Sequence, residues 1–194
     1  MIRSELKGDA LYYEVARVLS QKLAKRNGAI LDVGSGGHPA LEWFPEAAVR
    51  VSVDRRKPYD APGVLPVTDG FFDWKAEQVF DLALCLQVLQ QITNAQKAAQ
   101  KLLRIARIVV VSVPYKWKEG ERGAAQHYNI DEEMMLEWFG REPNFQYLCR
   151  EIASDAPRLI HVYERNAMIW STLSERTRLR ADRQAADEGA PAEV

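Results

Sequence analysis

The sequence predicts an α/β domain built on a doubly wound, mostly parallel sheet of seven strands, with helices on both faces and a C-terminal antiparallel hairpin. Short apolar segments alternate with segments of helical periodicity up to residue 140, which is typical of parallel strands joined by crossover helices. Two strand-like segments then follow, joined only by residues 154–157. Because parallel strands need a long crossover, so short a connection predicts an antiparallel pair. We expect this domain to extend over residues 1–165.

The first half of the chain should contain a helix and three short strands. Residues 10–26 place apolar side chains on one helical face, and Asn27 with Gly28 should end this helix. The apolar segments that follow are bounded by Gly, Pro and Asp residues, which mark turns. We expect strands over residues 29–33, 49–53 and 64–67, a short helix over 39–47 and a loop over 55–63.

The second half contains the clearest amphipathic stripe, in a helix that Thr93 or Asn94 can cap. Asn129 with Glu132 has the pattern of a capping box for a further helix, which Gly140 should end. We expect strands over residues 79–86, 108–113, 145–153 and 158–163, and a long polar loop over 115–128.

The charge balance and the apolar runs argue against several classes of protein. Lys and Arg together number 26 and Asp and Glu 27, so no net charge favours a nucleic acid partner. No apolar run could span a bilayer, and the first residues lack the apolar stretch of a signal peptide. Cys85 and Cys149 lie within apolar segments, which favours buried thiols over a disulfide. We therefore expect a cytoplasmic protein with no membrane contact, and we predict no metal site.

Residues 166–194 differ in composition from the rest of the chain. Residues 166–186 are rich in charge and could form a helix with a few apolar anchors, a candidate contact for a homodimer or a partner protein. Residues 187–194 should be disordered, because their composition cannot bury a core.

A glycine turn follows the first strand, at the sheet edge where doubly wound folds bind ligands. Gly34 and Gly36 lack Cβ atoms, which lets the backbone approach a ligand closely. Asp54 ends the next strand about 20 residues later, where a carboxylate can accept hydrogen bonds from ribose hydroxyls. Asp69 could accept a hydrogen bond from an exocyclic amine while Phe71 covers a purine face. Each has a plainer interpretation, since Asp and Gly are also common turn residues.

The residue after the turn bears on the type of cofactor. A dinucleotide fingerprint has a third glycine three residues after the second, where this chain has Pro39. Proline suits a first helical turn but does not allow the close packing that glycine permits. The turn is then less suited to a pyrophosphate, which favours S-adenosylmethionine over NAD.

Five segments together resemble the class I S-adenosylmethionine-dependent methyltransferases, which have a Rossmann-like fold, and in particular the methyltransferase type 11-like group. They are residues 30–36 (ILDVGSG), 51–54 (VSVD), 67–71 (VTDGF), 80–92 (FDLALCLQVLQQI) and 108–114 (IVVVSVP). The resemblance covers about residues 10–164 and implies that the first four of these segments contact the cofactor. The implied contacts are Asp32, Gly34, Ser35, Gly36, Asp54, Arg55, Asp69, Gly70, Phe71 and Leu86.

The chain departs from the family pattern at two places. His38 stands where the family has a third alternate glycine, and it could cover the methionine end of the cofactor or cap a helix. Gln87, Gln90 and Gln91 occupy a turn where the family often has Glu and His. A catalytically silent methyltransferase-like subunit that binds a protein partner is therefore an alternative.

The long loop follows a central strand and should face the methyl acceptor. Histidine can take a proton near neutral pH, so His127 is the candidate general base, with Tyr128 beside it. A packing role is the plainer interpretation of His127. Tyr115 and Trp117 could line the acceptor or pack the loop down. His161 lies inside a predicted strand and should be structural.

The function expected from these observations is transfer of a methyl group from S-adenosylmethionine to an oxygen or nitrogen of a small molecule. An RNA or protein methyltransferase is a further alternative, although the chain lacks a basic stripe. The fold cannot separate these functions, because one fold hosts many activities.

Overall fold

The computed structural model describes residues 10–120, 125–150 and 156–165. The helices are α1 (Ala10–Leu23), α2 (Ala95–Ile105) and α3 (Glu132–Phe139), with short 3₁₀ turns η1 (Ala40–Trp43) and η2 (Leu89–Gln91). The strands are β1 (Ala29–Val33), β2 (Val49–Val53), β3 (Leu65–Val67), β4 (Phe80–Leu86), β5 (Ala106–Pro114), β6 (Phe145–Cys149) and β7 (Arg158–Glu164).

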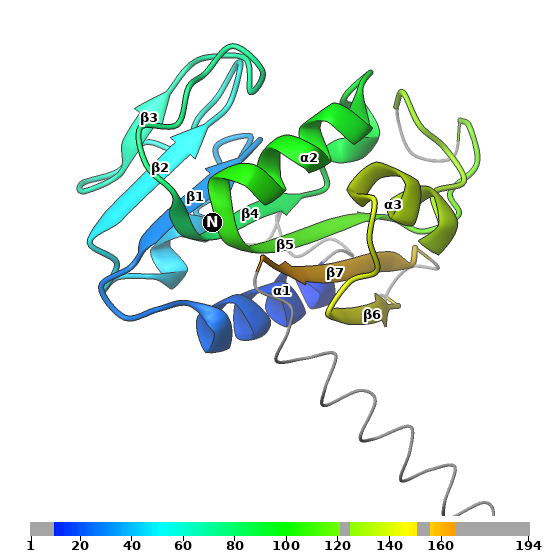
Figure 1. Cartoon of the computed structure of the whole chain (residues 1–194), viewed down its shortest axis with the longest axis horizontal. Coiled ribbons are helices and arrows are strands. Elements are labelled where there is room, and N and C mark those ends of the chain that lie inside the picture. Colours follow the sequence, from blue (N-terminus) through cyan, green and yellow to red (C-terminus); the bar gives the residue numbers. More distant parts are fainter. Residues whose placement is uncertain (1–9, 121–124, 151–155, 166–194) are drawn as a thin grey trace, which may run out of the picture.

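The seven strands form one sheet in the order β3-β2-β1-β4-β5-β7-β6 (Figure 1). β1 pairs in parallel with β2 and β4, and β5 pairs in parallel with β4. β7 runs antiparallel to both β5 and β6. The predicted fold class is confirmed, because a doubly wound parallel sheet ends in an antiparallel hairpin. The strand order reverses between β1 and β4, because β2 and β3 lie on one side of β1 and β4 and β5 on the other. Such sheets bind ligands at the carboxyl ends of the strands at this point.

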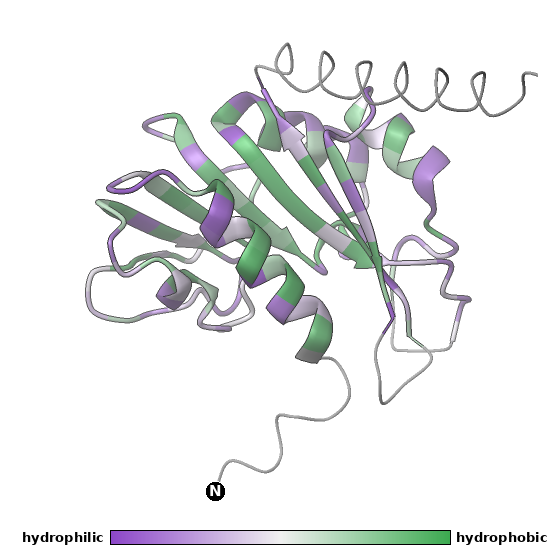
Figure 2. Cartoon of the chain, turned by 90° about the horizontal axis from the view of Figure 1, so that it is seen from below, coloured by the Kyte–Doolittle hydropathy of each residue, from purple (hydrophilic) through white to green (hydrophobic). Residues whose placement is uncertain are grey.

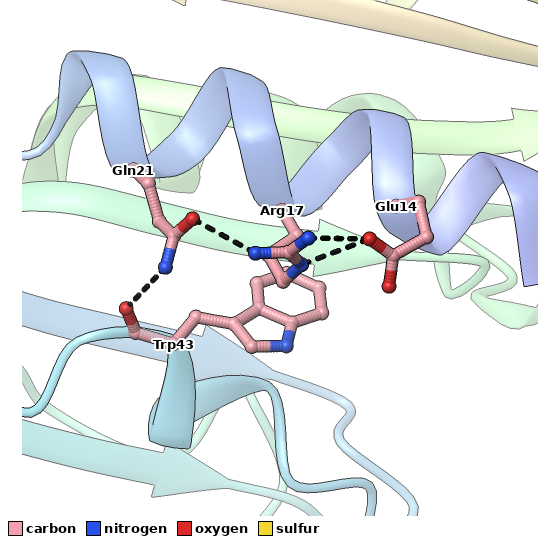
Figure 3. Close-up of polar contacts among 4 residues, drawn as sticks. All are labelled: Glu14, Arg17, Gln21 and Trp43. Atoms are coloured by element: carbon pink, nitrogen blue, oxygen red, sulfur yellow. Dashed lines mark hydrogen bonds and ion pairs between the residues drawn. The ribbon is translucent and has the colours of Figure 1, made fainter.

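The sheet separates two apolar layers. Successive strand residues face opposite sides, so Leu31 packs on the side of α2 and α3 while Ile30 packs on the side of α1. Viewed from below, the central strands are the most hydrophobic part of the molecule (Figure 2). On the outer side of α1, Arg17 bonds to Glu14 and Gln21, and Gln21 Nε2 donates to the Trp43 carbonyl at 2.9 Å (Figure 3). That last bond ties α1 to η1.

Two predicted helix ends agree with the structure, whereas the cap predicted at Asn129 and the predicted end of the first helix do not. Asn94 caps α2 by accepting from the Lys97 N–H, and Gly140 ends α3 in the left-handed region at φ 66°. The predicted cap at Asn129 is wrong, because Asp131 accepts from the Met134 N–H and caps α3 instead. Asn129 has φ 53°, whereas a capping residue has an extended backbone.

Several predicted boundaries are also corrected. α1 ends at Leu23 rather than residue 26, and the helix predicted over residues 39–47 is only the turn η1. Pro45 stops η1, since a residue before proline avoids the helical region. β5 follows α2 with no connecting loop, and β6 ends at Cys149, so Arg150 is not part of the strand. The rest of the predicted strand, residues 151–153, lies outside the described residues.

The remaining predictions concern the two cysteines, the C-terminal residues, membrane contact and metal binding. Cys85 and Cys149 are both buried, as expected. The helix and tail predicted over residues 166–194 and their partner contact fall outside the described residues, so the domain boundary at residue 165 stays a prediction. None of the described helices is long and apolar enough to cross a membrane. The described part of the chain also contains no cluster of acidic, Cys and His side chains that could hold a metal ion.

Candidate cofactor and acceptor sites

A large open cleft lies at the carboxyl ends of β1, β2 and β4. This glycine-turn cleft has a volume of about 1360 Å³. It is lined by Val33, Gly34 and Gly36, by residues 53–57 and 68–73, and by residues 87, 88 and 91–94. Of the predicted cofactor residues, the cleft brings together Gly34, Gly36, Asp54, Arg55, Asp69, Gly70 and Phe71.

The glycines are needed at the turn for different reasons. Gly34 has φ 74°, and a Cβ atom there would lie 2.5 Å from a methyl carbon of Val88. Gly36 has φ 58°, but a Cβ atom on it would meet no described atom within 4 Å. Gly34 therefore allows the close approach of Val88, which follows β4, whereas Gly36 leaves open space in the cleft.

Asp54 ties the glycine turn to the loop that follows β2. Its Oδ2 accepts from the Gly36 N–H at 2.9 Å, and its Oδ1 accepts from the N–H groups of Arg56 and Lys57 at 2.8 Å. Partial burial opposes the charge, but the N–H donors of Lys57, Arg56 and Gly36 hold the pKa of Asp54 below its ordinary value. Asp54 therefore presents a charged carboxylate to the cleft.

Asp32 lies at the end of β1, behind the turn rather than on the described wall of the cleft. It is 3% exposed, and its Oδ2 has no hydrogen-bond partner among the described residues. Burial raises the pKa of Asp32 to about 7, and the charge of Asp54 adds to the rise. A buried carboxyl of this kind would gain from a cationic partner, since an opposite charge favours the ionised form.

Ser35 and Leu86 are predicted cofactor residues that do not line the described cleft. Ser35 Oγ bonds to Ser52 Oγ at 3.0 Å and accepts from the N–H of Tyr59 at 2.9 Å, so it holds the turn against β2. Leu86 is buried in the apolar layer on the α1 side. Both support the site from behind.

The Asp69–Phe71 segment is held by a residue that the sequence did not single out. Lys101 of α2 donates to the carbonyls of Phe71 and Trp74, and its ammonium lies 4.8 Å from the centre of the Phe71 ring. Burial, followed by the charge of Arg104, lowers the pKa of Lys101. Asp69 Oδ1 accepts from the Gly70 N–H at 2.7 Å. Lys101 lies outside the apolar stripe of α2, and its hydrogen bonds reach residues that are distant in the sequence. The apolar pattern of α2 therefore could not predict this role.

Three basic residues follow β2 in the wall of the cleft, whereas only Arg55 was predicted to contact the cofactor. Arg56 and Lys57 also line the cleft, and the Lys57 side chain lies over the turn, 2.6 Å from where a Cβ of Gly37 would be. The run of three basic residues was visible in the sequence as part of a loop. Its conformation is fixed by the N–H groups of Arg56 and Lys57, which both donate to Asp54 Oδ1.

A second, smaller pocket lies between η2 and the loop after β5. This loop pocket has a volume of about 50 Å³. It is lined by Gln90, Gln91, Pro114, Trp117, Lys118, Ala125, His127, Tyr128, Asn129 and Ile130. Gln91 lines both this pocket and the glycine-turn cleft, so the two sites are neighbours. The structure therefore brings His127 and Tyr128 together, apart from the cofactor residues.

His127 is fixed in the loop pocket by three contacts. Its backbone N–H donates to the Gln90 carbonyl at 3.1 Å, and its Nε2 lies 2.9 Å from the Ile92 carbonyl. Its ring meets Trp138 edge to face with centres 5.0 Å apart. Because a carbonyl only accepts, Nε2 carries the proton and Nδ1 is the basic nitrogen of the neutral ring. The Tyr128 hydroxyl accepts from the Ala125 N–H at 3.0 Å.

The other two histidines lie outside these sites. His38 stacks on Tyr13 of α1 at 4.1 Å between ring centres and does not line the described cleft. It does not cap η1, whose N-cap position is Pro39 and has no side-chain cap. His161 is buried in β7, with Nδ1 2.9 Å from the Tyr163 hydroxyl, and burial lowers its pKa to about 4. His161 is thus neutral and structural, as predicted.

Solved structures share this fold at low sequence identity. The N-methyltransferase NodS from Bradyrhizobium japonicum, in complex with S-adenosylhomocysteine, has a TM-score of 0.63 and 11% identity over 80% of this chain and 86% of its own. The 1,6-didemethyltoxoflavin-N1-methyltransferase from Burkholderia thailandensis has a TM-score of 0.62 and 18% identity over 80% of this chain and 79% of its own. The [4+2]-cyclase SpnF has a TM-score of 0.60 and 14% identity over 77% of this chain and 79% of its own.

These similarities show that the chain has the Rossmann-like fold of class I methyltransferases. No protein-family model matches the chain. No curated protein matches it in sequence either.

Proposed function

We propose that the chain is an S-adenosylmethionine-dependent methyltransferase that acts on an oxygen or nitrogen of a small-molecule acceptor. The observation that carries this proposal is the junction of two sites at the carboxyl edge of the sheet. The glycine turn and Asp54 face one cleft, and His127 faces a neighbouring pocket that shares Gln91 with it. A transferase needs this arrangement, since donor and acceptor must be held side by side.

The residues of the glycine-turn cleft fit the groups of the cofactor. Asp54 offers a charged carboxylate to the ribose hydroxyls, and Asp69 with Phe71 suits the amine and face of the adenine. Asp32 supplies a buried carboxylate whose Oδ2 lacks a partner among the described residues, which suits the ammonium group of the methionine part. The NodS and toxoflavin enzymes carry S-adenosylhomocysteine in their structures. The cofactor would supply an electrophilic methyl group on a sulfonium sulfur.

The residues of the loop pocket are proposed to act on the acceptor. His127 would accept the acceptor's proton at Nδ1, because Nε2 is committed to the Ile92 carbonyl. Tyr128 can donate its O–H to the acceptor, because its oxygen already accepts from Ala125. The protein mainly positions the nucleophile, and proton removal assists when the nucleophile is a hydroxyl or a protonated amine.

Calorimetric titration tests the cofactor assignment. The native chain should bind S-adenosylhomocysteine and not NAD. Asp54→Ala should lose about 1.5–3 kcal/mol of binding free energy, as expected for hydrogen bonds to a charged group. Asp60→Ala, an exposed Asp of the same loop, is the matched control and should bind normally. Equal affinity in the Asp54 and Asp60 variants would remove Asp54 from the site.

A catalytically silent subunit is the second candidate, favoured by Gln87, Gln90 and Gln91 in place of Glu and His. Methyl transfer to a panel of hydroxyl- and amine-bearing metabolites separates the two. Transfer to any of them supports the enzyme, whereas tight cofactor binding without transfer to any supports the silent subunit. The cytoplasm is the proposed location, because thiols such as the buried Cys85 and Cys149 persist there.

A further inference from the structure

We propose that the loop pocket is a subsite that selects acceptors by an N–H or O–H group, with Gln90 Oε1 as the hydrogen-bond acceptor. This proposal deepens the proposed function and rests on it, since it assigns the pocket's ligand to the methyl acceptor. The ligand class is a small aromatic alcohol or amine. Its polar hydrogen would point at Gln90 and its ring would lie against the aromatic wall of the pocket.

The side chain of Gln90 is oriented by the protein itself. Gln90 is 6% exposed, and its Nε2 donates to the Gln87 carbonyl at 2.8 Å. A flipped amide would set two carbonyl oxygens against each other, so this hydrogen bond fixes which side-chain atom is Nε2 and which is Oε1. The buried Oε1 has no hydrogen-bond partner in the described part of the chain. A buried amide oxygen in this state favours a ligand that donates a hydrogen bond.

The backbone around Gln90 is held equally firmly. Its carbonyl accepts from the N–H groups of Gln126 and His127 at 2.8 and 3.1 Å, which fastens the loop to η2. Further along the loop, the Asn129 N–H donates to the Trp117 carbonyl at 2.8 Å. The pocket is therefore closed around Gln90 by main-chain bonds rather than by mobile side chains. Such support keeps a recognition group in place.

The remaining wall indicates the body of the ligand. Pro114, Trp117 and Ile130 present apolar surface beside Gln90. The Trp117 ring is fixed because its Nε1–H donates to the Pro157 carbonyl at 3.2 Å and one face packs on the Arg158 guanidinium at 4.1 Å. A pocket of about 50 Å³ has room for a polar group and the adjoining part of one ring. It is too small for a nucleotide or a folded peptide.

Phenol and anisole form a matched pair of probes, because they differ only by a methyl group on the oxygen and anisole cannot donate. The full chain, ¹⁵N-labelled and saturated with S-adenosylhomocysteine, is titrated with each probe while the Trp117 indole N–H signal is followed by NMR. The native chain should bind phenol about tenfold more tightly than anisole, the size expected when a buried acceptor is left without its donor.

Two variants of Gln90 separate recognition from structural support. Gln90→Met keeps the length and shape of the side chain but removes the acceptor oxygen. This variant should bind phenol and anisole with about equal affinity. Gln90→Glu keeps an acceptor oxygen and, when protonated, can still donate to the Gln87 carbonyl, so the preference should remain. Gln78→Met, at an exposed position, is the matched control and should behave as the native chain.

Equal affinities for phenol and anisole in the native chain would overturn the proposal. So would a preference that survives in Gln90→Met, or one that is lost equally in Gln90→Met and Gln90→Glu. If Gln90→Met does not fold, the probe ratios of the native chain and Gln90→Glu decide. A chain that does not bind S-adenosylhomocysteine contradicts the proposed function instead, and the two probes can then still be compared without it.

Discussion

The affinity for S-adenosylhomocysteine should rise about tenfold between pH 6 and pH 8 if Asp32 binds the ammonium group of the cofactor. Burial and the charge of Asp54 raise the pKa of Asp32 to about 7 in the free protein. Asp32 is then mostly neutral at about pH 6 and mostly ionised at about pH 8. Only the ionised form attracts the ammonium group strongly, so cofactor binding and loss of the proton are coupled.

The magnitude follows from the ionised fraction of Asp32. For a pKa of about 7, roughly one-tenth of the protein carries the carboxylate one pH unit below this value and roughly nine-tenths one unit above it. The apparent affinity is reduced by the fraction that is not competent to bind. The ratio of the two fractions gives the increase of about tenfold. Above about pH 8 the affinity should level off.

Calorimetric titrations at several pH values measure this dependence. 5′-Methylthioadenosine is the matched ligand, because it keeps the adenine and ribose but lacks the amino acid part. Its affinity should stay flat across the same range. Asp32→Asn keeps the shape of the side chain and removes the titration, so this variant should bind S-adenosylhomocysteine with no pH dependence between pH 6 and 8.

Two results would refute the reasoning. If both ligands tighten equally with pH, the titrating group acts on the nucleoside part and Asp32 is not the partner of the ammonium. If Asp32→Asn retains the full tenfold increase, another group is responsible. Asp54 is a poor alternative, because its N–H donors hold the pKa of Asp54 low and it stays ionised throughout.

Four further outcomes are expected. Because the folded-state pKa of Asp32 is raised from 3.8 to about 7, the stability that Asp32 contributes is lost as the pH rises between these values. Asp32→Asn should therefore gain up to about 4 kcal/mol of unfolding free energy relative to the native chain above pH 7, measured by urea denaturation, and little at about pH 4. Gly34→Ala should lower the melting temperature more than Gly36→Ala, because both residues have positive φ but only Gly34 also meets Val88; an equal loss would contradict the contact. His127→Ala should leave S-adenosylhomocysteine affinity nearly intact and slow methyl transfer by roughly 10²–10⁴-fold, whereas normal turnover would leave His127 a packing role only. Deleting residues 187–194 should leave the melting temperature unchanged, and a drop of several degrees would show that the tail docks.

The sequence predicted the sheet and the glycine-turn cleft because both depend on local patterns. Alternating apolar segments define strands, and the carboxyl ends of parallel strands meet at one edge of the sheet. Gly34, Asp54 and Asp69 each follow a strand, so their meeting follows from the strand order alone. Their shared cleft confirms that inference about position, while their role in binding stays a proposal.

The parts that the sequence could not predict depend on contacts between distant segments or on single backbone angles. Lys101 supports the Phe71 turn from α2, and Val88 closes on Gly34 from the end of β4. The cap of α3 is Asp131 rather than the predicted Asn129, because Asn129 has a positive φ. Both residues are good helix caps, so composition alone could not choose between them.

We expect the loop after β5, rather than the fold, to decide which reaction this chain performs. An N-methyltransferase and a [4+2]-cyclase have folds similar to that of this chain, so the fold alone does not select the chemistry. In this chain the loop is fastened through Gln126 and His127 to the carbonyl of Gln90 in η2. The next residue, Gln91, is part of the wall of both sites. One short turn therefore supports both proposed binding sites, and substitutions in it should change the relative placement of cofactor and acceptor more than the stability of the sheet.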